Sequence, residues 1–300
     1  MMKVVYGHTD SIYCQVDSVE KAQSVLSTLN EHVRSKFPNV LGLDEHPVTL
    51  EFEKYFRTLG VGATKNRNAG LITWKDGEFL DEEEFVMTGF TAKRISETPL
   101  DKEVQISVLN MWVGEKSEEE IVSYLNDIYE NVKSGNVDIQ RLLKRSRYRP
   151  ERFHVICRNC DTTSSLMFLT KAVCCSDMDL RTVSKSGKGW KSAGKSPVIG
   201  SGIIGTLLYN KLNREPIDDS YLYLKVRNNP HTLVHPIKQT VVKPDYYSAL
   251  KIEDFKNFTP DWSHYAESVI KKASPVFRAM GWDDSQIRKD SKQKTLDEWF

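Results

Sequence analysis

The first residues that could do chemistry lie near the start of the sequence, between two short runs of strand-forming residues. Residues 4–6 and 12–13 are typical of β-strands, and the polar stretch 7–11 between them is typical of a hairpin turn. Asp10 belongs to that turn, where an exposed carboxylate can bind a hard cation such as Mg²⁺. Polar turns that bind nothing are also common, so the turn alone leaves both interpretations open.

Cysteines in the middle of the chain form a second candidate group. Cys157 and Cys160 make a Cys-x-x-Cys pair, and Cys174 and Cys175 follow as neighbours. Because a Cys-x-x-Cys pair is a good half-site for Zn²⁺, the sequence predicts a small zinc-binding insertion. The second half is irregular, since adjacent cysteines seldom both bind one ion. His154 could replace one of them, and buried free thiols are the alternative.

The last eight residues, QKTLDEWF, combine a polar tail with large apolar side chains. In a short helical turn, Leu296, Trp299 and Phe300 would lie on one side as an apolar plug, with Gln293 beside them. The pattern Gln-x-x-aliphatic-x-x-aromatic-aromatic resembles the box with which proteins bind a sliding clamp. That resemblance implies a sliding clamp as a partner.

The composition of the 300 residues, 39% hydrophobic and 28% charged, is ordinary for a globular protein in water. No run of about 18 apolar residues is present, so we expect no membrane association through a spanning helix. The N-terminus lacks the apolar core of a signal peptide, and five cysteines without such a signal indicate a reducing compartment. We therefore expect a cytoplasmic protein.

Charge is segregated along the chain, although the net charge is only +1. Basic residues gather at 141–152 and at 181–195, whereas acidic residues gather at 81–84. Basic clusters in a near-neutral chain favour a phosphate backbone on one face. Solvated loops are the alternative interpretation of the same clusters.

Hydrophobic periodicity predicts an α+β fold with antiparallel strands. We expect a helix over 18–36, capped by Asp17 and Glu20, and strands over 48–58 and 70–76 that end at an Asp76-Gly77 turn. Further helices are expected over 100–112, 117–135 and 259–281. The stretch 184–205 is rich in Gly, Ser and Lys, and it predicts a loop.

The order of these pieces resembles the C-terminal part of a family B DNA polymerase, most like the archaeal enzymes. The Tyr-Gly-His-Thr-Asp-Ser stretch at 6–11 is similar to the palm motif Tyr-Gly-Asp-Thr-Asp-Ser of that family. The Lys-Asn-Arg-Asn-Ala-Gly stretch at 65–70 is similar to its Lys-Lys-Arg-Tyr-Ala-Gly stretch, and residues 86–94 resemble the crossover from palm to thumb. The resemblance covers residues 3–135 and, more weakly, 243–282.

The resemblance implies nucleotidyl transfer assisted by two Mg²⁺ ions. It implies that Asp10 is one metal-binding carboxylate and that Thr9 shapes the turn. His8 replaces an Asp of the family pattern, which removes a negative charge beside two cations. We therefore expect weakened Mg²⁺ binding, lowered activity and a shift of preference toward Mn²⁺. Glu51 and Glu53 share one face of their expected strand, and they either bind an accessory Mg²⁺ or face solvent.

The resemblance also implies a grip on primer–template DNA. Lys65 and Arg67 match cations that hold the duplex near the new terminus, and Lys93 and Arg94 lie where the chain enters the thumb. Arg145 and Arg147, in the basic stretch, are expected to join them. Contacts of this kind go to phosphates and carry little sequence information. Generic surface cations are the alternative.

Three parts of the family pattern are missing from the sequence: the motif with the other metal-binding Asp, the finger helix that binds the incoming dNTP, and the exonuclease. A Met directly before the palm motif then predicts a split enzyme whose large subunit carries these parts.

We expect part of a palm at 1–95, a mostly helical thumb at 96–282 with a Cys-rich insertion at 153–200, and a clamp-binding tail at 283–300. The predicted function is the small subunit of a split DNA-directed DNA polymerase. The alternative is an inactive DNA- and clamp-binding module.

Overall fold

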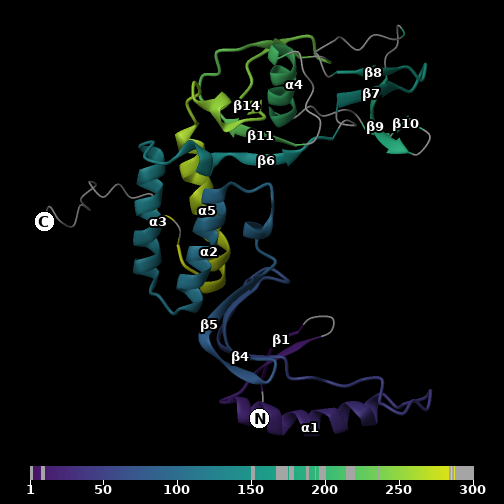
Figure 1. Cartoon of the computed structure of the whole chain (residues 1–300), viewed down its shortest axis with the longest axis vertical. Coiled ribbons are helices and arrows are strands. Elements are labelled where there is room, and N and C mark those ends of the chain that lie inside the picture. The colour runs from purple at the N-terminus through teal and green to yellow at the C-terminus, as the bar shows by residue number, and fades with distance from the viewer. Residues whose placement is uncertain are drawn as a thin grey trace, which may run out of the picture. The chain divides into compact units, whose positions relative to one another are not determined.

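A computed structural model describes most of the chain, in two units (Figure 1). The described residues are 3–7, 11–149, 153–166, 175, 179–186, 189–192, 194–195, 201–213, 220–235, 237–283, 285 and 287. Unit 1 consists of Met1–Phe90, Gln105–Tyr124 and Ala273–Phe300, and unit 2 consists of Thr91–Val104 and Leu125–Lys272.

Unit 1 is built on an antiparallel sheet of three strands in the order β3 (Lys54–Val61), β4 (Asn68–Lys75) and β5 (Glu78–Thr88). The central strand β4 is buried along most of its length. β4 and β5 are joined by Asp76-Gly77, whose φ angles of +52° and +100° suit the two-residue hairpin turn that an Asp-Gly pair favours. The predicted turn is confirmed.

The first strand of this sheet begins later than the sequence predicts. Alternation predicts a strand over 48–58, but β3 begins at Lys54, which pairs with Lys75 at the end of β4. Beyond that pair the neighbouring chain turns away, and the Asp76 N–H donates to the Glu53 carbonyl at 3.2 Å. The alternating residues before Lys54 therefore have no partner in β4, which ends at Lys75.

A separate two-stranded sheet, β1 (Lys3–Gly7) with β2 (Ile12–Gln15), precedes the helix α1 (Val19–Lys36). The predicted helix is confirmed, but its cap is Ser18, whose hydroxyl accepts a hydrogen bond from the Lys21 N–H. Asp17 instead forms an ion pair with Lys21. Ser18 is the cap because it directly precedes Val19, the first helical residue, and a polar side chain at that position reaches the backbone N–H groups of the first turn.

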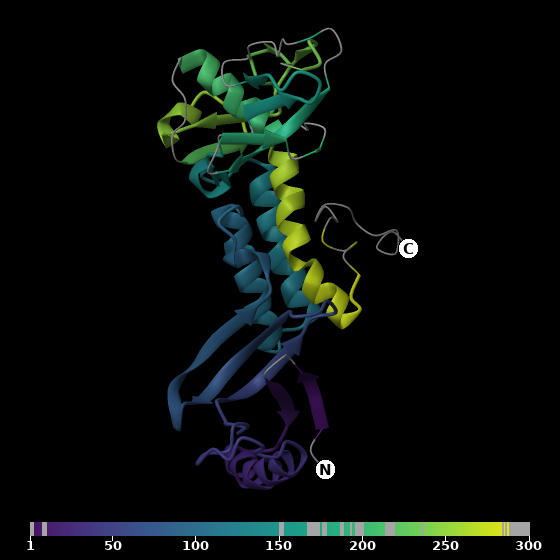
Figure 2. The ribbon, with the colours of Figure 1, turned by 90° about the vertical axis from the view of Figure 1, so that its right-hand side faces the viewer.

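Three long helices contribute segments to both units: α2 (Pro99–Val113), α3 (Glu118–Lys133) and α5 (Trp262–Met280). Within each unit their segments lie side by side in both views (Figures 1 and 2). The predicted capping box of α3 is confirmed, because the Ser117 N–H donates to the Glu120 carboxylate and the Glu120 N–H donates to the Ser117 hydroxyl.

Unit 2 contains three further antiparallel sheets in its described residues. A three-stranded sheet has the order β14 (Tyr246–Ala249), β11 (Ser220–Lys225) and β6 (Lys144–Arg147), and a pair is formed by β12 (Leu233–Val234) and β13 (Val241–Val242). A four-stranded sheet has the order β10 (Gly189–Ser192), β9 (Leu180–Ser186), β7 (His154–Cys157) and β8 (Thr163–Ser165). The helix α4 (Ser201–Asn213) packs against β14.

The expectation of a loop over 184–205 is wrong for most of its described residues, which belong to β9, β10 and the first turns of α4. Gly205 explains part of the error, since a Cβ atom there would lie 2.8 Å from the Tyr246 carbonyl oxygen. The glycine lets the helix approach the strand closely, so it serves packing where composition indicates a loop.

Every helix in the described part of the chain is too short or too polar to cross a lipid bilayer.

Candidate functional site

The hairpin of β1 and β2 packs onto the sheet of unit 1 through aromatic side chains. Tyr6 and Tyr13 lie 5.4 Å apart between ring centroids, and Tyr13 lies 6.0 Å from Phe56 on β3. The Tyr55 hydroxyl adds a hydrogen bond to the Val16 carbonyl. These contacts fix the strands on both sides of the turn.

The turn itself, with His8, Thr9 and Asp10, lies outside the described residues. The roles expected for these three residues therefore stay predictions. The structure fixes only the strand residues that lead into the turn and out of it.

A basic loop over residues 62–67 joins β3 to β4 beside this hairpin. The Gly62 N–H donates to the Arg67 carbonyl at 2.8 Å, which closes the loop. Asn66 has a φ of +61° and accepts a hydrogen bond from the Tyr6 hydroxyl at 3.2 Å. Lys65 is exposed and Arg67 is half-buried. The loop thus holds two cations next to β1, the strand that precedes residues 8–10.

Gly89, directly after β5, supports the same loop. Its φ is +77°, and a Cβ atom at this position would lie 1.9 Å from the Asn66 carbonyl oxygen. Such close approach to a backbone atom is open only to glycine. Sequence reasoning missed this residue, because a glycine near the end of a strand is also typical of an ordinary turn.

Glu51 and Glu53 are exposed and precede β3, so the strand that was expected to align them does not extend to them. Leu50 and Phe52, which alternate with them, are half-buried, and Phe52 stacks on Trp74 at 4.4 Å. The side chains of residues 50–53 therefore still alternate between a half-buried side and an exposed side. A metal-binding role for the two glutamates stays a prediction.

Unit 2 carries the remaining cations that were expected to bind DNA. Lys93 closes a 3-10 turn over Thr91–Lys93, and it is exposed together with Arg94. Arg145 and Arg147 are exposed on one face of β6, because they are two residues apart in a strand. Their exposure leaves these cations accessible to phosphate groups, and a DNA-binding role stays a prediction.

Unit 2 also contains a buried ion pair. The Lys272 ammonium on α5 donates to Glu97 at 2.6 Å and lies 3.9 Å from Asp101, with the three side chains 12%, 13% and 1% exposed. Ser268 donates a hydrogen bond to Asp101 at 2.9 Å. Burial raises the pKa of Glu97, but the hydrogen bond and charge of Lys272 outweigh it, so that the pKa lies below 4.5. The pair holds α5 to the start of α2.

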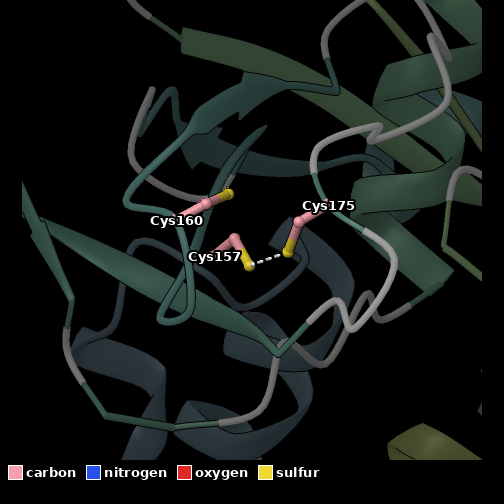
Figure 3. Close-up of side chains that lie close together, drawn as sticks. All are labelled: Cys157, Cys160 and Cys175. Atoms are coloured by element: carbon pink, nitrogen blue, oxygen red, sulfur yellow. Dashed lines mark hydrogen bonds between the residues drawn. The ribbon is translucent and has the colours of Figure 1, made fainter.

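The middle cysteines form a tight cluster, as the sequence predicted in part. The ligand atoms of Cys157, Cys160 and Cys175 all lie within 4.8 Å of one another, and the Sγ atoms of Cys157 and Cys175 are 3.7 Å apart (Figure 3). In the described residues, no other group of His, Cys, Asp or Glu is gathered so closely. Cys174 lies outside the described residues, and His154 is not part of the group.

The chain around Cys157 and Cys160 is a tight turn between β7 and β8. The Asp161 N–H donates to the Cys157 carbonyl at 2.8 Å, and the Cys157 N–H donates to the Thr162 carbonyl at 3.0 Å. The Cys160 thiol donates to the Thr162 hydroxyl at 3.3 Å, and the hydroxyl and backbone of Thr162 lower the pKa of Cys160. The turn therefore holds two sulfur atoms in one place and favours thiolate at one of them.

The clamp-binding residues expected at the C-terminus, Gln293, Leu296, Trp299 and Phe300, lie outside the described residues.

Comparison with known proteins assigns the class. The sequence model of DNA polymerase family B matches residues 1–154, which is more than half of the chain. This stretch contains the β1–β2 hairpin, the basic loop and the sheet of unit 1. The chain belongs to DNA polymerase family B.

Its relatives come from both archaea and eukaryotes. The chain is 31% identical over 144 residues to the DNA polymerase delta catalytic subunit of Mesocricetus auratus, an alignment that covers 47% of this chain and 12% of that protein. It is 29% identical over 142 residues to DNA polymerase 2 of Aeropyrum pernix, covering 47% of this chain and 15% of the relative. The chain thus spans less than a fifth of the length of these relatives.

One solved structure covers nearly the whole chain. The family B DNA polymerase of Pyrobaculum calidifontis superimposes with a TM-score of 0.50 over 98% of this chain and 27% of that protein, at 16% identity. This likeness concerns the fold alone.

Proposed function

We propose that this chain supplies part of the palm and the thumb of a split DNA-directed DNA polymerase, and that a large subunit completes the active site. The observation that carries the proposal is the family match over residues 1–154, together with the hydrogen bond from Tyr6 to Asn66. That bond joins β1 to a loop with two cations. A motif that binds metal ions and a grip on the primer terminus must be neighbours in such an enzyme.

Asp10 is the residue that would hold a catalytic cation in this chain. A carboxylate at a hairpin tip has the hard oxygen donors that Mg²⁺ requires, and exposed Glu51 and Glu53 could add an accessory ion. When bound, two Mg²⁺ ions activate the primer hydroxyl and stabilise the charge on the dNTP phosphates. His8 lowers the negative charge of this turn, so weaker Mg²⁺ binding and use of Mn²⁺ follow.

The cations of both units would bind the phosphates of primer–template DNA. Lys65 and Arg67 belong to unit 1, whereas Lys93, Arg94, Arg145 and Arg147 belong to unit 2. Contacts to phosphates position the duplex without reading its sequence, as replication requires.

An exposed apolar surface of unit 1 supports the need for a large subunit. β1 and β2 form a sheet of only two strands, and Val4, Val5 and Ile12 on it are exposed. In α1, Val19 is the one buried residue. Isolated two-stranded sheets are marginally stable in water, and the adjacent Val4 and Val5 of β1 expose apolar side chains on opposite faces of this one. The remaining palm of the large subunit is the partner that would cover them.

The division that goes with this proposal is palm over 1–95, thumb over 96–282 and tail over 283–300. The tail would bind a sliding clamp through Gln293, Leu296, Trp299 and Phe300, which tethers the enzyme to DNA. A cytoplasmic, nucleoid-associated enzyme follows from these partners.

The test is reconstitution. This chain is co-expressed with a polypeptide that carries the missing family B palm and finger segments, and primer extension is measured for each protein and for the pair. The pair should extend primers in Mg²⁺ or Mn²⁺, whereas this chain alone should not. Extension by this chain alone would overturn the split arrangement.

His8 also favours a second candidate function, an inactive module that binds DNA and a sliding clamp. A reconstituted pair that binds primer–template DNA without extending it would support that module.

A further inference from the structure

The cysteine cluster of unit 2 has the dimensions of a metal site. In a tetrahedral thiolate site the Zn–S bonds are about 2.3 Å long, which places neighbouring sulfur atoms about 3.8 Å apart. The Sγ atoms of Cys157 and Cys175 are 3.7 Å apart, and Cys160 lies within 4.8 Å of both. A disulfide would require about 2.05 Å. The sulfur atoms would therefore have to move by only about 1 Å to bind a cation between them.

The three sulfur atoms come from separate places along the chain (Figure 3). Cys157 ends β7, Cys160 lies in the turn toward β8, and Cys175 lies in the connection between β8 and β9. The turn is fixed by the Asp161 and Cys157 backbone hydrogen bonds. The Arg158 N–H also donates to the Asp179 carbonyl at 3.0 Å, which joins the turn to the chain that enters β9. Two ligands are thus preorganised, and a metal would tie the third segment to them.

The different exposure of the three cysteines argues against thiols that only fill the core. Cys157 is fully buried, but Cys160 is exposed and Cys175 is half-buried, so the cluster extends from the interior to the surface. A cysteine that only fills the core has no reason to gather with exposed thiols. Within the described residues, Phe153, Val155, Leu166 and Leu207 form a buried apolar cluster beside this sheet. A metal would add a further link between the chain segments that meet here.

We propose that Cys157, Cys160 and Cys175 bind a structural Zn²⁺ ion that holds the turn after β7 to the segment between β8 and β9. Soft thiolate donors select Zn²⁺ over Mg²⁺ or Ca²⁺, so the ion differs from the catalytic cations. A fourth donor completes the tetrahedron. The site stabilises unit 2 and takes no part in nucleotidyl transfer, so its test is independent of the proposed polymerase function.

The test measures metal in the purified full chain by inductively coupled plasma mass spectrometry. Wild-type protein should contain about one zinc per chain, and Cys160→Ser should lower the zinc content at least tenfold. Because the site stabilises unit 2, the serine variant should also unfold at a lower temperature than the wild type, measured by circular dichroism. Cys14→Ser is the matched control, since Cys14 lies on β2 in unit 1 and should leave the zinc content unchanged.

A second measurement identifies the ligands. Replacing zinc by Co²⁺ should give the visible absorption of a tetrahedral thiolate complex and a thiolate-to-metal charge-transfer band in the near ultraviolet. That band should weaken in Cys175→Ser. Wild-type chain that is folded without metal and binds no Co²⁺ would overturn the proposal, as would iron in place of zinc. Equal zinc in wild type and Cys160→Ser would overturn it as well.

Discussion

Gly89 has a backbone φ of +77°, and a Cβ atom there would lie 1.9 Å from the Asn66 carbonyl oxygen and 2.9 Å from its carbon. Replacing Gly89 by Ala should therefore displace the basic loop over 62–67. The left-handed conformation costs an alanine roughly 1–2 kcal/mol. The clash involves a backbone atom that no rotamer change can move, and forced shifts of this kind cost about 1–3 kcal/mol more. The total loss of unfolding free energy should be about 2–5 kcal/mol.

Gly281 provides the matched control. It also lies in unit 1 and has a φ of +72°, but a Cβ atom added there would meet no other atom within 4 Å. Gly281→Ala should cost only the conformational part, roughly 1–2 kcal/mol. The difference between the two variants measures the contact with Asn66. Urea unfolding followed by circular dichroism gives both free energies.

The same variants connect the loop to DNA binding. Gly89→Ala should weaken binding of the chain to fluorescent duplex DNA, measured by anisotropy, because Lys65 and Arg67 lose their positions. Gly281→Ala should leave the affinity near that of wild type. If Gly89→Ala were as stable as Gly281→Ala and bound DNA equally well, the inferred support of the loop by Gly89 would be wrong.

Three further predictions concern ions and charges. Replacing Lys272 by Met should cost about 3–5 kcal/mol, because a buried carboxylate pair loses its cation. The pKa of Glu97 is lowered in the folded chain, so ionised Glu97 stabilises the fold above the unfolded value of 4.5. This contribution to the free energy of unfolding is lost as the pH falls through the folded pKa. Acid unfolding of the wild type and of the variant would show the difference. Lys65→Ala and Arg67→Ala should each reduce the salt slope of duplex binding by about one unit, measured by anisotropy at several salt concentrations. His8→Asp should raise Mg²⁺-dependent primer extension of the reconstituted pair relative to extension in Mn²⁺.

Each of these changes has a control or an outcome that would contradict it. Arg141→Ala breaks an ion pair with Glu103 in which the side chains are 38% and 53% exposed, and it should cost less than about 1 kcal/mol. An equal loss for Lys272→Met would show that burial does not set the cost. Lys116→Ala removes a cation paired with Glu120 and should keep the salt slope. An unchanged Mg²⁺ to Mn²⁺ ratio in His8→Asp would remove His8 from metal selection.

Local signals in the sequence identified several elements correctly. The Asp76-Gly77 turn and the Ser117–Glu120 capping box each depend on residues close in the chain, and both are confirmed. The Cys157-x-x-Cys160 pair likewise identified two members of the cysteine cluster, because the turn that joins them is local. The family resemblance is confirmed by the match over residues 1–154.

Features that depend on distant contacts were missed. Glu97 and Lys272 are 175 residues apart, so no spacing rule could pair them. The need for glycine at positions 89 and 205 depends on the carbonyl groups of Asn66 and Tyr246, which only the folded chain brings near. For the same reason, the end of the pairing between β3 and β4 could not be read from alternation alone.

The most direct test of the account is primer extension by the reconstituted pair with Asp10 replaced by Asn, a substitution that keeps the shape of the side chain and removes its charge. We predict that extension is lost in both Mg²⁺ and Mn²⁺ while binding of primer–template DNA is retained. Extension by the Asp10→Asn pair at the wild-type rate would contradict the claim that this chain contributes a metal-binding carboxylate to the polymerase active site.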